Sequence, residues 1–210
     1  MNLVNYYWWF KSALPPRVCD HIVKYGLRHE DGIAITGGLG RTRDLKKQPL
    51  NKKEIKDLKK KRDSNIVWMD DRWIYNEVQP YIHQANKSAG WNFDWNWSEA
   101  CQFTKYKPGQ YYDWHCDSWE GVYKAKGPTE GKIRKLSVTV SLSDEKDYSG
   151  GELEFQFRNQ DNPKRTKVCT EILPRGSVVV FPSFIWHRVK PVTKGVRYSL
   201  VLWNLGYPFK

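Results

Sequence analysis

The feature that most constrains the fold is a strict alternation of apolar and polar residues in the second half of the chain. In residues 136–142, LSVTVSL, a Leu or Val occupies every second position and a Ser or Thr lies between. Residues 152–157, ELEFQF, alternate in the same way. Because successive side chains of a strand point to opposite faces, this period of two predicts strands rather than helices.

From about residue 100 the chain divides into eight such segments, separated by Gly, Pro and Asp. They cover residues 101–106, 111–117, 134–143, 151–158, 167–173, 177–182, 187–192 and 196–205. DYSGG at 147–151 is typical of a turn. Eight short strands fit a mostly β (α+β) fold: a double-stranded β-helix, or cupin-like jelly roll.

The first hundred residues show mixed and partly helical patterns. Helices are predicted within 15–28, 51–63 and 71–90, and a strand at 65–69. Pro80 leaves the continuity of the third helix open. We expect these helices to pack outside the barrel, so that residues 1–210 form one domain with a mixed support region at 1–99 and a jelly-roll core at 100–205.

Composition indicates a folded protein outside the membrane. Apolar residues make up 40% of the chain and aromatic residues 15%, which is too rich for a disordered chain. The sequence lacks a membrane-length apolar run and a secretion-signal layout, so we expect a soluble, cytoplasmic monomer. No C-x-x-C pair occurs, which favours four free thiols. Cys116 would point away from its neighbours on a strand, so we exclude it as a ligand.

The net charge of +12 is concentrated in one segment. Residues 41–62 hold eleven Lys and Arg against three Asp and Glu. Such a segment can bind nucleic acid or an acidic partner. It lacks the interleaved aromatic residues of a single-strand binder, and a solvated helix and loop is the preferred interpretation.

A candidate metal site begins with His115 and Asp117. Two positions apart on an extended backbone, they point the same way. His187 opens the seventh predicted strand, and in a jelly roll the second and seventh strands are neighbours. Two imidazoles and one carboxylate on one side of an ion form the facial triad of non-haem Fe(II) oxygenases.

An anion site is predicted beside it. Arg197 and Ser199 share a face of the last strand, and a buried Arg is suited to holding a carboxylate bidentately. Tyr106 could add a phenol. Each pattern alone occurs by chance, but a purely structural explanation needs all of them to coincide in the order that a metal-and-carboxylate site requires.

The motifs resemble those of the Fe(II)- and 2-oxoglutarate-dependent dioxygenases, in particular the prolyl 4-hydroxylase-like branch. YKPGQYYDWHCD is similar to Tyr-x-x-Gly-x-x-Tyr-x-x-His-x-Asp, and GSVVVFPSFIWHRVKPVTKGVRYS to the run from Gly-x-x-x-x-Phe-Pro through His-x-Val-x-Pro-Val to Gly-x-Arg-x-Ser. The resemblance covers roughly residues 100–204 and extends to small bacterial and phage-encoded hydroxylases.

The resemblance implies a set of cofactors and roles. Fe(II) would be bound by His115, Asp117 and His187, and 2-oxoglutarate by Arg197 with Ser199 and Tyr106. O2 would be the second cosubstrate, succinate and CO2 the products, and ascorbate a reductant that keeps the iron reduced.

The resemblance also implies a substrate pocket. In this branch an Arg, a Trp and a His form the prolyl pocket; Arg134 and Trp203 match the first two, whereas Leu205 stands at the His position. Residues 118–133, rich in Gly, are predicted to form a mobile flap, or else a plain surface hairpin. Trp119 and Tyr123 of this segment are further candidate substrate residues.

Four functions therefore remain. The first is hydroxylation of a prolyl residue in a peptide or protein. The second is hydroxylation of a free amino acid or other metabolite. The third is a nucleic-acid demethylase of the same superfamily. The pattern typical of that branch is Arg-x-x-x-x-x-Arg on the last strand, whereas this chain has Trp203 six residues after Arg197. The fourth is a non-catalytic jelly-roll binding protein, which would have no reason to keep these residues in register.

Overall fold

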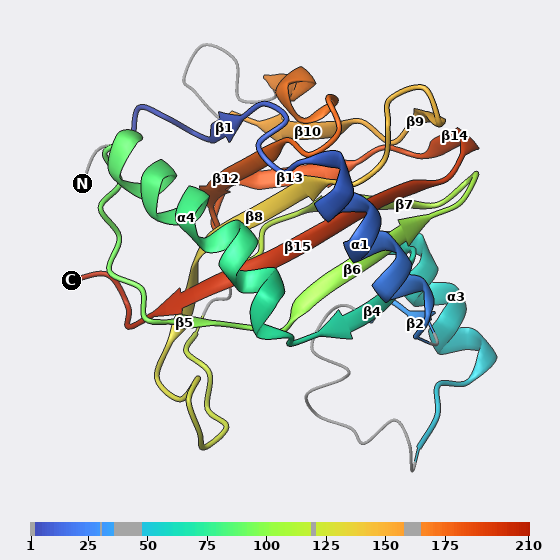
Figure 1. Cartoon of the computed structure of the whole chain (residues 1–210). Helices are drawn as coiled ribbons and strands as arrows, with labels where there is room; N and C mark the ends of the chain where they lie inside the picture. Colours follow the sequence, from blue (N-terminus) through green and yellow to red (C-terminus); the bar gives the residue numbers. More distant parts are fainter. Residues whose placement is uncertain (1–2, 30, 36–47, 119–120, 158–164) are drawn as a thin grey trace.

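Two antiparallel sheets lie face to face in the computed structural model, which describes residues 3–29, 31–35, 48–118, 121–157 and 165–210 (Figure 1). The major sheet has the order β1 (Trp8–Phe10), β12 (Val178–Pro182), β8 (Ile133–Ser141), β15 (Arg197–Gly206), β6 (Cys101–Tyr106), β4 (Asn65–Met69) and β2 (Gly32–Ile33), with β5 (Trp97–Ser98) also paired to β15. The minor sheet has the order β11 (Thr166–Val168), β10 (Leu153–Gln156), β13 (Trp186–Val189), β7 (Tyr111–His115) and β3 (Arg62–Asp63). Each of the eight predicted segments contains a strand, and the jelly-roll prediction is confirmed.

Two local predictions were wrong. Residues 147–151 are not only a turn, because β9 (Tyr148–Gly150) pairs with β14 (Val192–Gly195). Gly150 allows this pairing: its φ is +74°, and a Cβ there would lie 2.3 Å from the Pro191 carbonyl oxygen. The segment 167–173 keeps its strand only at the start, in β11, and then forms a 3-10 turn, η1 (Thr170–Ile172).

Strand β8 shows how the alternating pattern is used. Its apolar side chains pack against α1 (Pro16–Leu27) and α4 (Arg72–Ser88), which lie across the outer face of the major sheet (Figure 1). Its Ser and Thr side chains are buried too, on the inner face between the sheets. The polar half of the pattern therefore faces the interior of the barrel rather than water.

The helices are held by their buried stripes. Ile22 of α1 and Ile74, Val78 and Ile82 of α4 are fully buried in one cluster with β8 and β15. Burying each such side chain contributes roughly 1.5–3 kcal/mol. Because of this packing, α4 remains continuous at Pro80, although a proline removes one helical hydrogen bond.

One short stretch, residues 62–69, contributes a strand to each sheet. β3 pairs with β7 in the minor sheet, and β4 pairs with β6 in the major sheet. The chain thus passes from the minor sheet, beside β7, to the major sheet, beside β6, within residues 62–69. The strand at 65–69 was predicted, whereas β1, β2, β3 and β5 were not.

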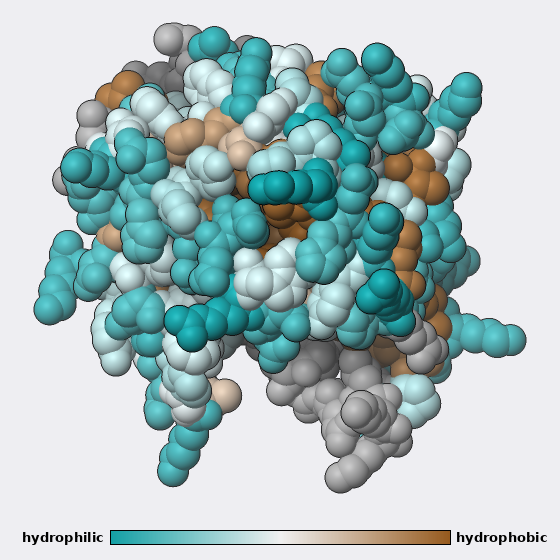
Figure 2. All heavy atoms as spheres, in the orientation of Figure 1, coloured by the Kyte–Doolittle hydropathy of each residue, from teal (hydrophilic) through white to brown (hydrophobic). Residues whose placement is uncertain are grey.

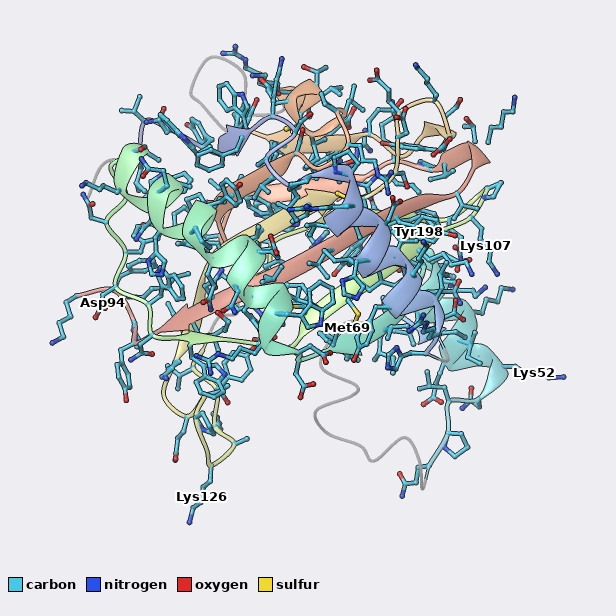
Figure 3. All side chains as sticks on the ribbon, viewed as in Figure 1. Lys52, Met69, Asp94, Lys107, Lys126 and Tyr198 are labelled. Carbon is cyan, nitrogen blue, oxygen red and sulfur yellow. The ribbon has the colours of Figure 1, made fainter. Side chains whose placement is uncertain are left out.

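The basic segment is described only from residue 48 onwards; residues 41–47 lie outside the described part. α3 (Lys52–Lys61) begins with a capping box between Asn51 and Glu54 and exposes its lysines. Figure 3 shows Lys52 extending away from the body of the protein. The solvated helix is confirmed here, but Arg62 at its end is buried.

The face that carries α1 and α4 is mostly hydrophilic, with small hydrophobic areas between (Figure 2). Among the described residues, no helix has both the length and the apolar character that crossing a membrane requires.

Candidate active site

Strand pairing brings the three candidate metal ligands together. β7 and β13 are antiparallel neighbours, and His115 lies directly opposite His187. Asp117 follows the end of β7, where its backbone N–H donates to the Ser183 carbonyl at 2.8 Å. The nitrogen and oxygen atoms that these three side chains offer all lie within 4.8 Å of one another.

Backbone carbonyls orient both imidazoles. Nδ1 of His115 lies 2.7 Å from the Asp113 carbonyl, and Nδ1 of His187 lies 2.9 Å from the Ile185 carbonyl. A carbonyl only accepts, so each Nδ1 carries a proton, and in the neutral form of each ring Nε2 has the free lone pair. The two Nε2 atoms face the Asp117 carboxylate at 3.8 and 3.6 Å.

The charge state of the site suits a cation. Burial lowers the pKa of His115 well below its usual value, and the neighbouring His187 lowers it further. Burial alone would raise the pKa of Asp117, but attraction to the two histidines and a hydrogen bond from Ser137 hold it at about 2. A carboxylate and lone pairs aimed at one point are the donor set that Fe(II) takes in facial triads, so these residues fit the metal.

The predicted anion site lies in the same cavity. β15 pairs with β6 so that Arg197 lies opposite Tyr106. The Arg197 guanidinium donates to the Ser199 hydroxyl at 3.3 Å and lies 5.6 Å from the Tyr106 ring. Within the described ranges, no carboxylate pairs with this 3%-exposed arginine. These three residues line one cavity with the metal ligands.

The candidate substrate residues are partly brought together. The Arg134 guanidinium stacks 3.9 Å from the Trp203 ring, and Trp203 also lines the cavity. Nε1 of Trp203 is buried and has no hydrogen-bond partner among the described residues. Leu205 is fully buried, and Trp119 lies outside the described residues.

Glu99 is a partner of Arg134 that the sequence did not reveal. It accepts from Arg134 through both carboxylate oxygens, at 2.9 and 2.5 Å, and it also accepts from the Tyr123 hydroxyl. Tyr123 belongs to the predicted flap, whose tip at Lys126 projects away from the body (Figure 3). The flap is therefore tied to Arg134 through Glu99, and its mobility stays a prediction.

Three further residues of the site were missed. Ser137 donates to the Asp117 carboxylate at 2.7 Å. Arg62 and Gln102 line the cavity from strands β3 and β6. The alternating pattern of β8 could have identified Ser137 as an inward-facing hydroxyl, but no local pattern in the sequence distinguishes Arg62 from the lysines before it.

Comparisons with known proteins agree with this geometry. Residues 101–204 match the sequence model of the 2OG-Fe(II) oxygenase superfamily. A PKHD-type hydroxylase of Pseudomonas fluorescens Pf-5 is 39% identical over 99 residues, which are 47% of this chain and 40% of that protein. The chain thus matches about two fifths of the length of this curated relative.

Solved structures share the fold over nearly the whole chain. A prolyl-4-hydroxylase of Pseudomonas putida superposes with a TM-score of 0.65 and 18% identity, covering 96% of this chain and 93% of that one. A prolyl hydroxylase of Trichoplax adhaerens, in complex with a hypoxia inducible factor peptide fragment, superposes with a TM-score of 0.64 and 19% identity, covering 96% of this chain and 84% of that one.

The chain belongs to the 2OG-Fe(II) oxygenase superfamily, as its residues 101–204 show. The curated relatives that it matches include PKHD-type hydroxylases, and prolyl hydroxylases are among the solved structures that share its fold. This family implies Fe(II), 2-oxoglutarate and O2, and the triad of His115, Asp117 and His187 fits the iron.

Proposed function

We propose that this chain hydroxylates an unactivated C–H bond at the expense of 2-oxoglutarate and O2, releasing succinate and CO2, with a prolyl residue of a peptide or protein as substrate. One observation carries the proposal: the triad of His115, Asp117 and His187 shares a cavity with a buried arginine, Arg197, that pairs with no carboxylate in the described part of the chain.

Each residue has a physical role in this proposal. His115, Asp117 and His187 would hold Fe(II), which together with 2-oxoglutarate and O2 supplies the oxidising chemistry. Arg197 would bind the distal carboxylate of 2-oxoglutarate, and Ser199 and Tyr106 would orient it. The burial of these groups excludes water, so the charge–charge contacts are stronger than at the surface.

The prolyl assignment is supported by the second set of residues. Arg134 is rigidly placed by Glu99 against Trp203, and the buried Trp203 N–H can donate to a carbonyl of a bound peptide. The two solved structures compared above are prolyl hydroxylases, one of them in complex with a peptide fragment. Leu205, where the branch has a His, leaves a free amino acid or other metabolite as the second candidate.

We further propose that residues 1–210 act as one domain and as a monomer. Ascorbate would restore the reduced iron after turnover without substrate. A nucleic-acid substrate ranks lower, because Trp203 stands where the demethylase branch has its second arginine.

The first test is spectroscopic. Anaerobic addition of Fe(II) and 2-oxoglutarate should produce the weak metal-to-ligand visible band, and Arg197→Met should raise the 2-oxoglutarate concentration needed for it. Absence of the band in folded wild-type protein would refute the oxygenase assignment and favour a binding protein.

The second test identifies the substrate. Succinate release should be measured with proline-containing peptides, free amino acids and methylated oligonucleotides. We expect stimulation by peptides and none with His115→Ala. Stimulation only by an amino acid or an oligonucleotide would overturn the prolyl assignment, and turnover that survives His115→Ala would overturn the ligand assignment.

A further inference from the structure

A second arginine, Arg62, is buried in the cavity that contains the metal ligands. It ends the basic segment, whose described lysines on α3 are exposed, yet Arg62 is only 4% exposed. The cause is the change from helix to strand: β3 pairs Arg62 with Tyr112 at the edge of the minor sheet, and its side chain lines the cavity. The chain therefore removes from water a cation that the sequence pattern assigns to a solvated face.

The protein surrounds Arg62 with neutral groups. Its Nε donates to the Ser64 hydroxyl at 2.9 Å, and one terminal nitrogen donates to the Gln102 side-chain oxygen at 3.4 Å. The guanidinium lies 4.4 Å from the Tyr112 ring centre. Within the ranges that the structure describes, no carboxylate pairs with it.

Other buried arginines show the contrast. Arg134, which is also less than a tenth exposed, is neutralised by Glu99 through two hydrogen bonds. A buried cation without an anion is costly, because it has lost its hydration without a compensating charge. Arg62 thus resembles Arg197, the arginine proposed for the cosubstrate, rather than the arginines that serve structure.

Arg62 is placed close to the reacting centre. The Tyr112 ring that it contacts stacks on the His115 imidazole, with ring centres 3.5 Å apart and an angle of 11°. The cosubstrate does not need this arginine: Arg197 is available for its distal carboxylate, and the metal site for its keto acid end. An anion at Arg62 would therefore come from the molecule that is hydroxylated.

We propose that Arg62 binds a carboxylate of the substrate, so that the enzyme prefers a substrate whose hydroxylated carbon lies near a free carboxylate. This inference rests on the proposed function and narrows it: a peptide that ends in a proline with a free α-carboxylate would suit the cavity better than a proline within a long neutral chain. Gln102 and Ser64 hold the guanidinium in place, which limits the entropy lost on binding.

The test compares two probes that differ by one charge. N-acetyl-L-proline carries a carboxylate, and N-acetyl-L-prolinamide has the same ring without it. Each is titrated by calorimetry into protein saturated with Mn(II) and 2-oxoglutarate, so that Arg197 is already occupied. We expect the acid to bind about tenfold or more tightly than the amide, as a charge-assisted contact implies, and Arg62→Gln to remove this preference.

Matched variants separate the site from general attraction by the basic surface. Lys61→Met removes the adjacent, exposed positive charge and should leave the tenfold preference intact. Arg62→Lys keeps the charge but not the planar fork, and should retain part of it. Equal binding of both probes to wild type, no binding of the acid, or equal loss of preference in Lys61→Met would each overturn the proposal.

Two readouts distinguish this inference from the proposed function. Arg62→Gln should leave the visible band with Fe(II) and 2-oxoglutarate, and the affinity for 2-oxoglutarate, within about twofold of wild type. If the variant instead weakens 2-oxoglutarate as Arg197→Met does, Arg62 serves the cosubstrate and the inference is wrong. If wild type gives no band, the proposed function has failed instead.

Discussion

Ser137→Ala isolates one hydrogen bond behind the metal site. Ser137 is fully buried on β8 and donates to Oδ2 of Asp117 at 2.7 Å. Its hydroxyl also lies 2.9 Å from that of Ser183, whose carbonyl holds the Asp117 backbone. Replacing Ser137 by Ala removes the donor from the carboxylate and leaves the fold of β8 unchanged, because Ala fits wherever Ser does.

The magnitude follows from the charge on Asp117. A hydrogen bond to a charged group contributes about 1.5–3 kcal/mol, and loss of a group that orients a metal ligand costs about 10–100-fold in affinity. The Asp117 backbone stays tied to Ser183, so the ligand is not released entirely. We therefore expect metal binding to weaken about tenfold, or about 1.4 kcal/mol.

The assay is calorimetric titration with Mn(II), which does not oxidise during the measurement. Ser177→Ala is the matched control: Ser177 is also fully buried, and its hydroxyl accepts one hydrogen bond, from the Ser12 backbone at 3.1 Å, away from the cavity. A Ser137→Ala protein that is folded and binds Mn(II) within twofold of wild type would refute the reasoning, as would an equal loss in Ser177→Ala.

Three further outcomes are expected. Gly176→Ala should lower the free energy of unfolding by more than about 2 kcal/mol, because φ at Gly176 is +80° and the new Cβ would lie 2.1 Å from the Leu14 carbonyl oxygen. The control is Gly32→Ala, which has open space around the new Cβ and should not lower the free energy of unfolding by this amount. Urea unfolding of both variants measures the difference. A thiol reagent should label Cys116 first in native protein, because Cys116 is partly exposed whereas the other three thiols are buried; rapid labelling of more than one would contradict this. Asp117, with its pKa held at about 2 against about 3.9 unfolded, stabilises the metal-free fold above pH 4 and loses this contribution as the pH falls towards 2. Asp117→Asn should reduce the loss of unfolding free energy between pH 5 and pH 2 by about 2 kcal/mol, and an unchanged pH dependence would count against it.

The features that follow from local periodicity and from strand order could be predicted from the sequence. The alternating segments predicted the jelly roll, and the expectation that the second and seventh strands pair placed His187 beside His115, which the register confirms. Period two also placed Arg197 and Ser199 on one face, where the structure has them in contact. These inferences need only the geometry of a strand and a known strand order.

What the sequence could not supply depends on pairing between distant segments. β3 has two residues, and its register with β7 alone decides that Arg62 turns inward while the preceding lysines stay in water. Glu99 is likewise defined as the partner of Arg134 only by the packing of β5, β8 and β15. Such partners are chosen by tertiary contacts, which no local pattern records.

The passage of residues 62–69 between the two sheets limits which fragments of the chain can be expressed. β4 and β3 cover the edges of β6 and β7, and both lie outside the stretch that matches the family. A fragment limited to residues 101–204 would lack both strands and expose the edges of β6 and β7, and unpaired strand edges promote aggregation through edge pairing. The smallest useful expression fragment therefore has to begin before β3, even though the iron ligands do not.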